Sequence, residues 1–511
     1  MEAWNRAGLS DRKAVVVIGD GALTGGLAFE ALSHAGQLSK NLIIVLNDNQ
    51  MSISPNIGSI SRYLSSLSMT GFYQRFRRAV DSLVEKIPNS RNHIGKIIFR
   101  LKRGLKGLVI RENLFSDLGL EYVGPLDGHD IRRLEETFRR VRKLPKPVVV
   151  HVMTKKGKGY SPAENEPAAF HGVGPFQISN GVMEKFDATS FTAAFSRKIV
   201  ELGEKDARIC CITAAMAKGT GLDSFSRRFP ERFYDVGIAE EHAVTFASGL
   251  SAGGLVPVVA IYSTFIQRAI DQIIHDVCLP NLPCVFALDR SGAVPGDGET
   301  HQGIFDIALL RCVPNLEILS PVSQSDLNVC LDYAVGANRP VALRYPKSAC
   351  PSELPPFSSE IRRGRGILVR AEDYAPSLSV RFDGGAKSAG TLSSVLYVTT
   401  GGLFSEVLKA ARANLSAGVY TDIYSLRFIK PVDEDYFAAL CAGYGKIIFA
   451  EDGVRLGGIS EHLAGVLHGA GTAATSIRAF PDTFLPHGTQ EEILGRAGLS
   501  FRELSVGGGG A

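Results

Sequence analysis

Two short motifs, Gly19-Asp20-Gly21-Ala22 and Asn47-Asp48-Asn49, decide the fold of the first part of this sequence. An apolar, β-branched run at 13–18 precedes the first motif, and a second run at 42–46 precedes the other. Such runs predict buried strands of a parallel sheet. Residues 23–35 between them have helical periodicity, so the sequence predicts a βαβ unit.

Both motifs follow strands, which places them at the carboxyl ends of a parallel sheet, where α/β proteins bind ligands. Asp20 and Asn49 offer a carboxylate and an amide oxygen, donors that suit Mg²⁺ with phosphate and water completing its shell. Gly21 and Ala22 open a helix whose backbone N–H groups can approach a diphosphate. Gly-Asp-Gly alone is an ordinary strand-to-helix turn; with the Asn at this spacing it predicts a thiamine diphosphate site.

Glu240 begins a second informative stretch, Glu240-Glu241-His242-Ala243. A helical Glu is ordinarily a surface residue, but the neighbours Ala243, Phe246 and Ala247 predict that Glu240 is buried. A buried carboxyl group can share a proton with the ring nitrogen of an aminopyrimidine.

Further polar residues follow later strands. Phe265 stands just after a strand end, where it can be a core residue or stack on a pyrimidine ring. Arg290 follows a strand and Arg344 ends a later one. Together they can bind a phosphate, although a lone Arg is more often a surface ion pair. The loop at 297–303 combines Asp297 and His301 with several glycines, and a plain turn explains only the glycines.

Length and composition favour a soluble multidomain α/β protein. The 511 residues are 45% hydrophobic and 21% charged, which excludes disordered and fibrous classes. We expect three α/β domains with mainly parallel sheets, at 1–187, 188–350 and 351–511. The net charge of +4 implies no nucleic-acid partner.

The cysteines and the apolar windows bear on location. Eight cysteines without a Cys-x-x-Cys spacing predict reduced, buried thiols in a cytoplasmic protein and no zinc site. The uncharged window 243–267 contains glycines and a proline, which favours a buried helix and strand over a membrane span. The window 71–112 carries eleven Lys/Arg against three Asp/Glu. Within it, residues 91–106 have an apolar helical stripe, and a solvated basic helix is favoured there over a membrane-surface helix.

The sequence resembles the 1-deoxy-D-xylulose-5-phosphate synthase family, thiamine diphosphate enzymes of the transketolase class. The resemblance covers nearly the whole chain. It is carried by the stretches GDGALTGGLAFEALSHAG, VLNDNQMSIS, GPLDGHD, TKKGKGY, DVGIAEEHAVTFASGL, PVVAIYSTFIQRAIDQIIHDV, DGETHQGIFDIALLRCVPN, LRYPK and PHGTQEE.

The resemblance implies a role for each matching residue. The implied metal ligands are Asp20, Asn49 and the Met51 carbonyl, and the implied cofactor contacts are Gly21, Ala22, Asn49, Tyr160, Glu240 and Phe265. The implied catalytic residues are Glu240, His171, Asp297 and His301. The implied substrate contacts are Tyr262, Arg268, Arg290 and Arg344.

The implied reaction joins pyruvate and D-glyceraldehyde 3-phosphate, with loss of CO₂, to give 1-deoxy-D-xylulose 5-phosphate for isoprenoid, thiamine and pyridoxal synthesis. The resemblance also implies a homodimer. The family carries a long segment with a Ser-Gly-His stretch before the Gly-Asp-Gly strand, so we expect an incomplete first sheet here. Two alternatives stay open: a non-catalytic truncated paralogue or fragment, and a transketolase or 2-oxoacid dehydrogenase component.

Overall fold

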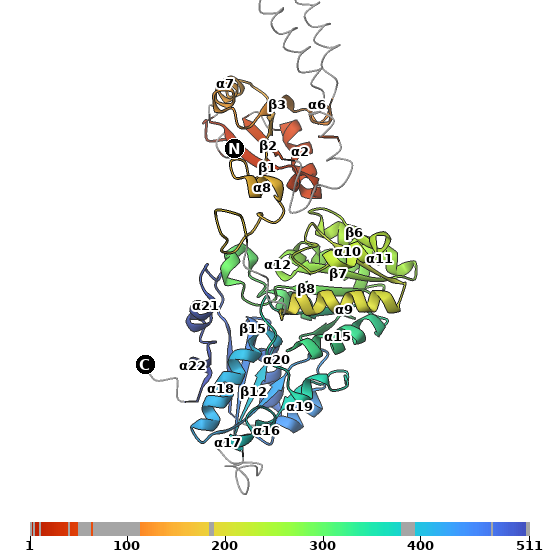
Figure 1. The fold of residues 1–511 in the computed structure, drawn as a ribbon, viewed down its shortest axis with the longest axis vertical. Helices are drawn as coiled ribbons and strands as arrows, with labels where there is room; N and C mark the ends of the chain where they lie inside the picture. Colours follow the sequence, from red (N-terminus) through yellow and green to blue (C-terminus); the bar gives the residue numbers. More distant parts are fainter. Residues whose placement is uncertain are drawn as a thin grey trace, which may run out of the picture. The chain divides into compact units, whose positions relative to one another are not determined.

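The computed structural model divides the chain into two compact units (Figure 1). The first contains Met1–Glu184 and Gly237–Ala239, and the second contains Lys185–Val236 and Glu240–Ala511. The structure describes residues 3, 6–9, 12–38, 41–49, 63–64, 113–182, 189–379, 394–471 and 474–506. Met51 and the whole basic window 71–112 therefore lie outside the described residues. The three domain boundaries stay a prediction.

The first unit is built on a four-stranded parallel sheet of order β1-β2-β4-β3. Its strands are β1 (Ala14–Gly19), β2 (Leu42–Asp48), β3 (Glu121–Asp127) and β4 (Val148–Met153). Its helices include α2 (Gly26–Leu38), α6 (Leu114–Asp117), α7 (Ile131–Val141) and α8 (Ser161–Asn165). The expected βαβ unit is present as β1, α2 and β2. Strand β3 was not predicted, because Gly124 and Pro125 interrupt its apolar pattern where its register shifts.

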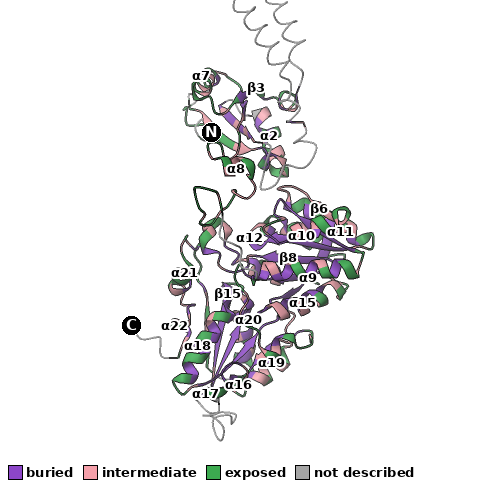
Figure 2. Cartoon of the chain, viewed as in Figure 1, coloured by how far each residue is buried: buried purple, intermediate pink, exposed green. Residues whose placement is uncertain are grey.

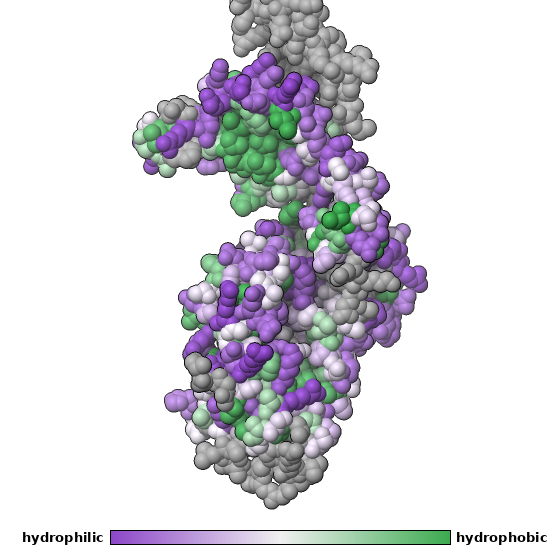
Figure 3. Space-filling model, turned by 60° about the vertical axis from the view of Figure 1, so that its left-hand side comes forward, coloured by the Kyte–Doolittle hydropathy of each residue, from purple (hydrophilic) through white to green (hydrophobic). Residues whose placement is uncertain are grey.

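Strand β1 lies at one edge of this sheet among the described strands. Its side chains Val15, Val16 and Val17 are exposed, and so is Leu27 on α2. Figure 3 shows apolar surface gathered on this unit. Parallel sheets normally bury both faces, so the described residues of the unit leave part of an apolar face uncovered.

The second unit contains two sheets. The larger has the order β14-β9-β10-β8-β7-β5-β6 and is parallel except for β14. Its strands are β5 (Ile209–Thr213), β6 (Phe233–Asp235), β7 (Val256–Tyr262), β8 (Val285–Asp289), β9 (Glu317–Leu319), β10 (Val341–Arg344) and β14 (Phe428–Lys430). Helices α9 (Phe191–Lys205), α11 (Glu240–Ala252), α14 (Asp306–Arg311) and α15 (Gln324–Gly336) accompany it.

The apolar pattern of residues 264–277 predicts one helix, and this prediction is wrong. The chain forms α12 (Ser263–Ile266), a 3₁₀ turn at Gln267–Ala269, α13 (Ile270–Gln272) and a π-helical segment at Ile273–Cys278. Ala269 leaves helical geometry, with φ −108° and ψ 18°, and so divides the run. Apolar periodicity does not report such breaks, which occur often at functional sites.

The smaller sheet has the order β11-β13-β12-β15-β16 and is parallel except for β11. Its strands are β11 (Ile367–Val369), β12 (Ser394–Thr399), β13 (Tyr420–Ser425), β15 (Lys446–Val454) and β16 (Ala474–Phe480), with α18 (Phe404–Ser416) and α20 (Ile459–Gly469) among its helices. The central strands of both sheets are buried (Figure 2). Within the described part of the chain, no helix is long and apolar enough to cross a membrane.

Candidate active site

The first unit places the predicted metal ligands at neighbouring strand ends. Gly19 pairs with Asn47 in the β1–β2 register, and the N–H of Asp20 donates to the carbonyl of Asn47 at 3.1 Å. Asp20 and Asn49 therefore follow adjacent parallel strands, and the Asp20 side chain is buried. Met51, the third predicted ligand, lies outside the described residues.

A buried polar chain fixes the end of β2. The Tyr122 hydroxyl contacts His151 Nδ1 at 2.7 Å, and His151 Nε2 contacts Asp48 Oδ2 at 2.9 Å. The Thr154 hydroxyl also donates to Asn47 Oδ1 at 2.7 Å. These contacts engage the side chains of the two residues before Asn49, and so they set the position from which Asn49 leaves the strand.

Gly21 and Ala22 begin a short 3₁₀ turn, Ala22–Thr24, directly after Asp20. The Thr24 hydroxyl closes this turn by donating to the Gly21 carbonyl at 2.7 Å. The turn keeps Gly21 and Ala22 beside Asp20, as the motif predicts.

Tyr160 and His171 lie in the segment after β4. The Tyr160 hydroxyl donates to the Ile178 carbonyl at 2.8 Å, and its ring contacts Phe170 and Phe176. His171 Nδ1 lies 2.9 Å from Lys156 Nζ. Burial lowers the pKa of His171, and the Lys156 charge lowers it further.

Lys156 was not singled out from the sequence. Burial lowers the pKa of its ammonium group, while the nearby Asp20 carboxylate acts in the opposite direction. Lys156 thus links the surroundings of Asp20 to those of His171. The signal for it was weak, because the stretch TKKGKGY contains three lysines that the sequence alone does not distinguish.

In the second unit, Glu240 is the first residue of α11 and is only 2% exposed, as its apolar neighbours predicted. Arg268 Nη1 donates to Glu240 Oε1 at 2.6 Å. The Arg268 guanidinium also lies over the Phe265 ring, 5.0 Å from its centroid. Phe265 is half-buried, so part of this ring stays open.

An aromatic group connects these residues to the next strand end. The rings of Phe265 and Tyr262 stack with centroids 5.8 Å apart, and the His301 ring meets Phe265 edge-on at 5.4 Å. Burial raises the pKa of Tyr262 to about 12, so it stays a phenol at neutral pH. Burial lowers the pKa of His301, as do Arg290 and Lys347, while Asp297 opposes the shift.

Two cations converge on Asp297. Arg290 Nη1 lies 2.5 Å from Asp297 Oδ2, and Lys347 Nζ lies 2.9 Å from the same oxygen. The Arg290 guanidinium also covers the Tyr262 ring at 3.9 Å. Burial alone would raise the pKa of Asp297, but Lys347 and Arg290 hold it below its ordinary value. The carboxylate is therefore ionised at neutral pH.

Arg290 itself has φ +62°, a conformation that non-glycine residues adopt rarely. Backbone strain of this kind is found at functional sites. Lys347 was missed by the sequence analysis, although it stands in the quoted stretch LRYPK. Its position just beyond the end of β10 was the available signal.

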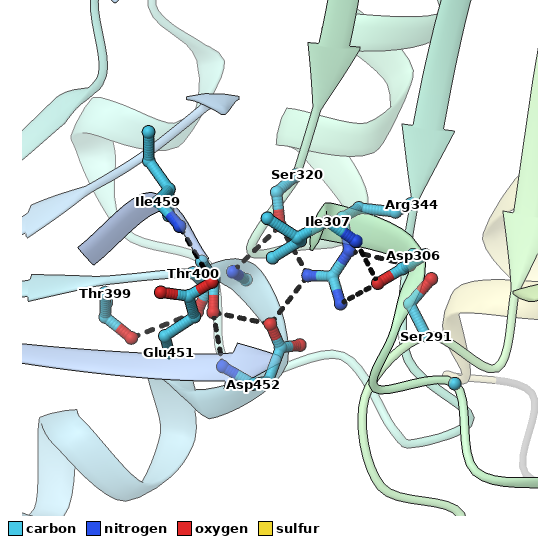
Figure 4. Close-up of polar contacts among 12 residues, drawn as sticks. Ser291, Asp306, Ile307, Ser320, Arg344, Thr399, Thr400, Glu451, Asp452 and Ile459 are labelled. Atoms are coloured by element: carbon cyan, nitrogen blue, oxygen red, sulfur yellow. Dashed lines mark hydrogen bonds and ion pairs between the residues drawn. The ribbon is translucent and has the colours of Figure 1, made fainter. Parts of the chain in front are cut away.

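Arg344 is placed differently from Arg290. It is fully buried, and Figure 4 shows its guanidinium between Asp306 and Asp452. Its Nε lies 2.9 Å from Asp306 Oδ2 and its Nη1 lies 2.6 Å from Asp452 Oδ1. Its donors are thus directed at protein carboxylates, and the structure does not bring it to the Arg290–Lys347 pair. A phosphate-binding role for Arg344 stays an untested prediction.

Three family models match the chain. Residues 1–154 match 1-deoxy-D-xylulose-5-phosphate synthase, 187–353 match the transketolase pyrimidine-binding domain, and 386–504 match the transketolase C-terminal domain. A 1-deoxy-D-xylulose-5-phosphate synthase of Treponema pallidum is 50% identical over 495 residues, which covers 97% of this chain and 76% of the relative. The chain belongs to the 1-deoxy-D-xylulose-5-phosphate synthase family.

Other comparisons agree with membership of the 1-deoxy-D-xylulose-5-phosphate synthase family. The synthase of Desulforudis audaxviator is 44% identical over 96% of this chain and 75% of its own length. Transketolase from Campylobacter jejuni is a structural neighbour with a TM-score of 0.51 and 16% identity, covering 97% of this chain and 77% of that one. A split-gene transketolase, described as an inactive β4 tetramer, has a TM-score of 0.52 and 23% identity, covering 62% of this chain and 95% of its own.

The likeness to the two transketolases confirms the expected fold class, α/β with mainly parallel sheets. Family membership makes the chain a transferase of the transketolase class. It also selects 1-deoxy-D-xylulose-5-phosphate synthase over the transketolase and dehydrogenase alternatives.

Proposed function

We propose that this chain decarboxylates pyruvate and transfers the two-carbon unit to D-glyceraldehyde 3-phosphate, giving 1-deoxy-D-xylulose 5-phosphate and CO₂. The observation that carries the proposal is a continuous series of contacts in the second unit. It runs from the buried acid Glu240 through Arg268, Phe265 and Tyr262 to Arg290, which pairs with Asp297 beside Lys347. An acid and a phosphate-binding cation pair thus lie in one site.

The residues fit thiamine diphosphate. A buried carboxylate beside a partly open aromatic ring suits an aminopyrimidine, which needs a proton donor for its ring nitrogen and a face for stacking. Glu240 would hold the ring nitrogen, Phe265 would stack on the ring, and Tyr160 would contribute from the first unit. When bound, the cofactor supplies the carbon centre that makes loss of CO₂ from a 2-oxoacid possible.

Mg²⁺ and the diphosphate are assigned to the first unit. Asp20 and Asn49 would ligate the ion with the Met51 carbonyl, and the backbone of Gly21 and Ala22 would contact phosphate oxygens. The donor set supports this, since a carboxylate and an amide oxygen at adjacent strand ends are hard ligands that leave room for phosphate. Lys156, whose pKa responds to the Asp20 carboxylate, would add a positive charge that attracts the diphosphate.

The phosphate of the aldehyde substrate is assigned to Arg290 and Lys347. Both cations share one carboxylate, so the group keeps a net positive charge that a phosphate dianion can neutralise. The Tyr262 ring contacts the face of the Arg290 guanidinium in a cation–π interaction. This proposal gives Lys347 the phosphate contact that the family resemblance implies for Arg344.

Proton transfer is assigned to residues near the reacting carbons. The lowered pKa of His301 keeps its imidazole neutral at pH 7, and a neutral imidazole can accept a proton and return it. Asp297 and Arg268 would orient the substrates, and His171 would act from the first unit, where its pKa is also lowered.

We infer a homodimer in the cytoplasm. Ile274 and Leu279, in and directly after the π-helical segment, are exposed apolar residues, as is Leu309 on α14. All eight cysteines are free, and six of them are buried, which fits a reducing compartment. Light scattering is expected to give about twice the chain mass of 54.9 kDa, and the chain mass itself would contradict the dimer.

Glu240→Gln tests the proposal. The amide keeps a hydrogen bond to Arg268 but cannot supply the proton, so we expect product formation to fall by at least about 100-fold. Glu241→Gln, on the exposed face of the same helix, is the matched control and should retain full activity. Equal activity of the two variants would refute the role of Glu240.

A further inference from the structure

The loop that carries Asp297 and His301 is closed at its base by a pair of glycines. The N–H of each of Gly292 and Gly303 donates to the carbonyl of the other at 2.8 Å. Gly292 has φ +77°, and a side chain on Gly303 would meet the Arg290 carbonyl at 2.2 Å. The loop 292–303 therefore has a tightly defined neck immediately after Arg290.

Strand β15 and the segment after β16 contact this loop and the residue that follows it. The N–H of Val454 donates to the Ile304 carbonyl at 2.9 Å, and the N–H of Gly488 donates to the Pro295 carbonyl at 3.3 Å. The carboxylate of Asp452, on β15, lies against the neck, since a Cβ on Gly292 would meet Asp452 Oδ2 at 3.1 Å. No hydrogen-bond partner of this oxygen is found among the described residues.

Arg344 connects Asp452 to the far end of the loop. Its Nη1 binds Asp452 Oδ1, while its Nε and Nη2 bind both oxygens of Asp306 at 2.9 and 3.3 Å. Asp306 begins α14 three residues after Gly303. One guanidinium thus joins Asp452, which lies against Gly292 at the start of the loop, to Asp306, which begins the helix after the loop (Figure 4).

The network is anchored on its other side as well. The Thr400 hydroxyl donates to Asp452 Oδ1 at 2.5 Å and accepts from the Asp452 N–H at 2.9 Å. Ser320 Oγ accepts from the N–H of Gly401 at 3.0 Å. Asp452 is therefore held by Arg344 on β10 and by Thr400 directly after β12.

We propose that Asp452 and Arg344 are positioning residues, through which the smaller sheet sets the geometry of the loop 292–303 and with it the affinity of the site for the substrate phosphate. The inference rests on the proposed function of Arg290 and Lys347. This proposal gives Arg344 a positioning role in place of the substrate contact that the family resemblance implies. Asp452 and Arg344 act through the backbone of Gly292 and through Asp306.

The test is calorimetric binding of sn-glycerol 3-phosphate, an unreactive phosphate ester, to the whole chain and to Asp452→Asn. The matched control is Asp326→Asn, because Asp326 and Arg427 form an equally buried ion pair within the second unit, at 2.7 Å, that does not contact the loop. We expect D452N to weaken binding at least 10-fold and to speed hydrogen exchange across 292–303. We expect D326N to change binding less than 2-fold at a comparable loss of Tm.

Gly292→Ala provides a second route if D452N does not fold. It leaves the ion pairs in place but puts a methyl group against the Asp452 carboxylate, and it should also weaken binding at least 10-fold. Unchanged binding in D452N overturns the positioning role and leaves the proposed phosphate site standing. If D452N does not fold, unchanged binding in Gly292→Ala has the same meaning. Equal weakening by D452N and D326N also overturns the positioning role. Failure of the unaltered chain to bind the ester would refute the phosphate site and this inference together.

Discussion

Lys347 and Arg290 share the Asp297 carboxylate, and this arrangement sets the expected effect of removing one cation. Lys347 is partly exposed, so we discount its contribution to the lower end of the range for charged hydrogen bonds, about 1.5 kcal/mol. Lys347→Ala should raise the Kd for sn-glycerol 3-phosphate about 10-fold, and Lys347→Arg should keep most of the affinity. Calorimetric titration of the three proteins decides this. Unaltered affinity in the Ala variant would remove Lys347 from the site.

Asp289, just before Arg290, gives a prediction of pH dependence. Burial raises its pKa from 3.8 to about 7, and Thr192 donates to its Oδ2 at 2.7 Å. Between about pH 4 and 7 the unfolded chain ionises this group while the folded chain keeps it protonated, so the stability it contributes falls as pH rises. Asp289→Asn keeps an acceptor for Thr192. It removes the pH-dependent fall in the free energy of unfolding, which amounts to at most about 4 kcal/mol.

Thermal unfolding at two pH values measures this effect. The Tm of Asp289→Asn relative to the unaltered chain should be higher at pH 8 than at pH 5. The same Tm difference at both pH values would show that the ionisation of Asp289 is not linked to folding.

At the scale of elements, helix α2 packs on the turn before β3 at one glycine. A Cβ on Gly36 would lie 1.7 Å from the Leu118 carbonyl oxygen, whereas a Cβ on Gly26 would meet nothing within 4 Å. Gly36→Ala should therefore destabilise the first unit by about 1–3 kcal/mol through overpacking. Gly26→Ala, in the same helix, should be neutral or slightly stabilising.

Hydrogen exchange of the α2 amides reports the outcome. Faster exchange is expected in the Gly36 variant and no increase in the Gly26 variant. Equal exchange in both would mean that α2 moves away from Leu118 at little cost.

Strand ends were predictable from the sequence, and so was much of the candidate site. Tyr262, Arg290 and Asp20 follow apolar runs, and the carboxyl ends of parallel strands meet at one edge of a sheet. The breaks within helices could not be predicted from the sequence, because the π-helical segment at Ile273–Cys278 has the same apolar character as an α-helix. Nor could β3, whose pattern is interrupted by Pro125.

The choice between Arg344 and Lys347 shows a different limit. Arg344 ends β10 and Lys347 follows three residues later, and the sequence offers no local reason to prefer either. The choice depends on Asp452, more than a hundred residues away on another sheet, which binds Arg344 inside the protein. Only the packing of the two sheets reveals this.

At the scale of the whole molecule, the residues proposed for the reaction are drawn from each of the two units. Asp20 and Asn49 belong to the first unit and Glu240, Arg290 and Lys347 to the second. Transfer of the two-carbon unit then requires the cofactor, Mg²⁺ and both substrates together. This distinguishes the chain from the non-catalytic alternative, which needs only binding.

The most direct measurement supplies the whole chain, thiamine diphosphate and Mg²⁺ with pyruvate labelled with ¹³C at C2 and C3 and unlabelled D-glyceraldehyde 3-phosphate. We expect 1-deoxy-D-xylulose 5-phosphate that carries both labels, with unlabelled CO₂ released and no product when either substrate is omitted. Binding of cofactor and phosphate ester without any labelled five-carbon product would contradict the proposed reaction.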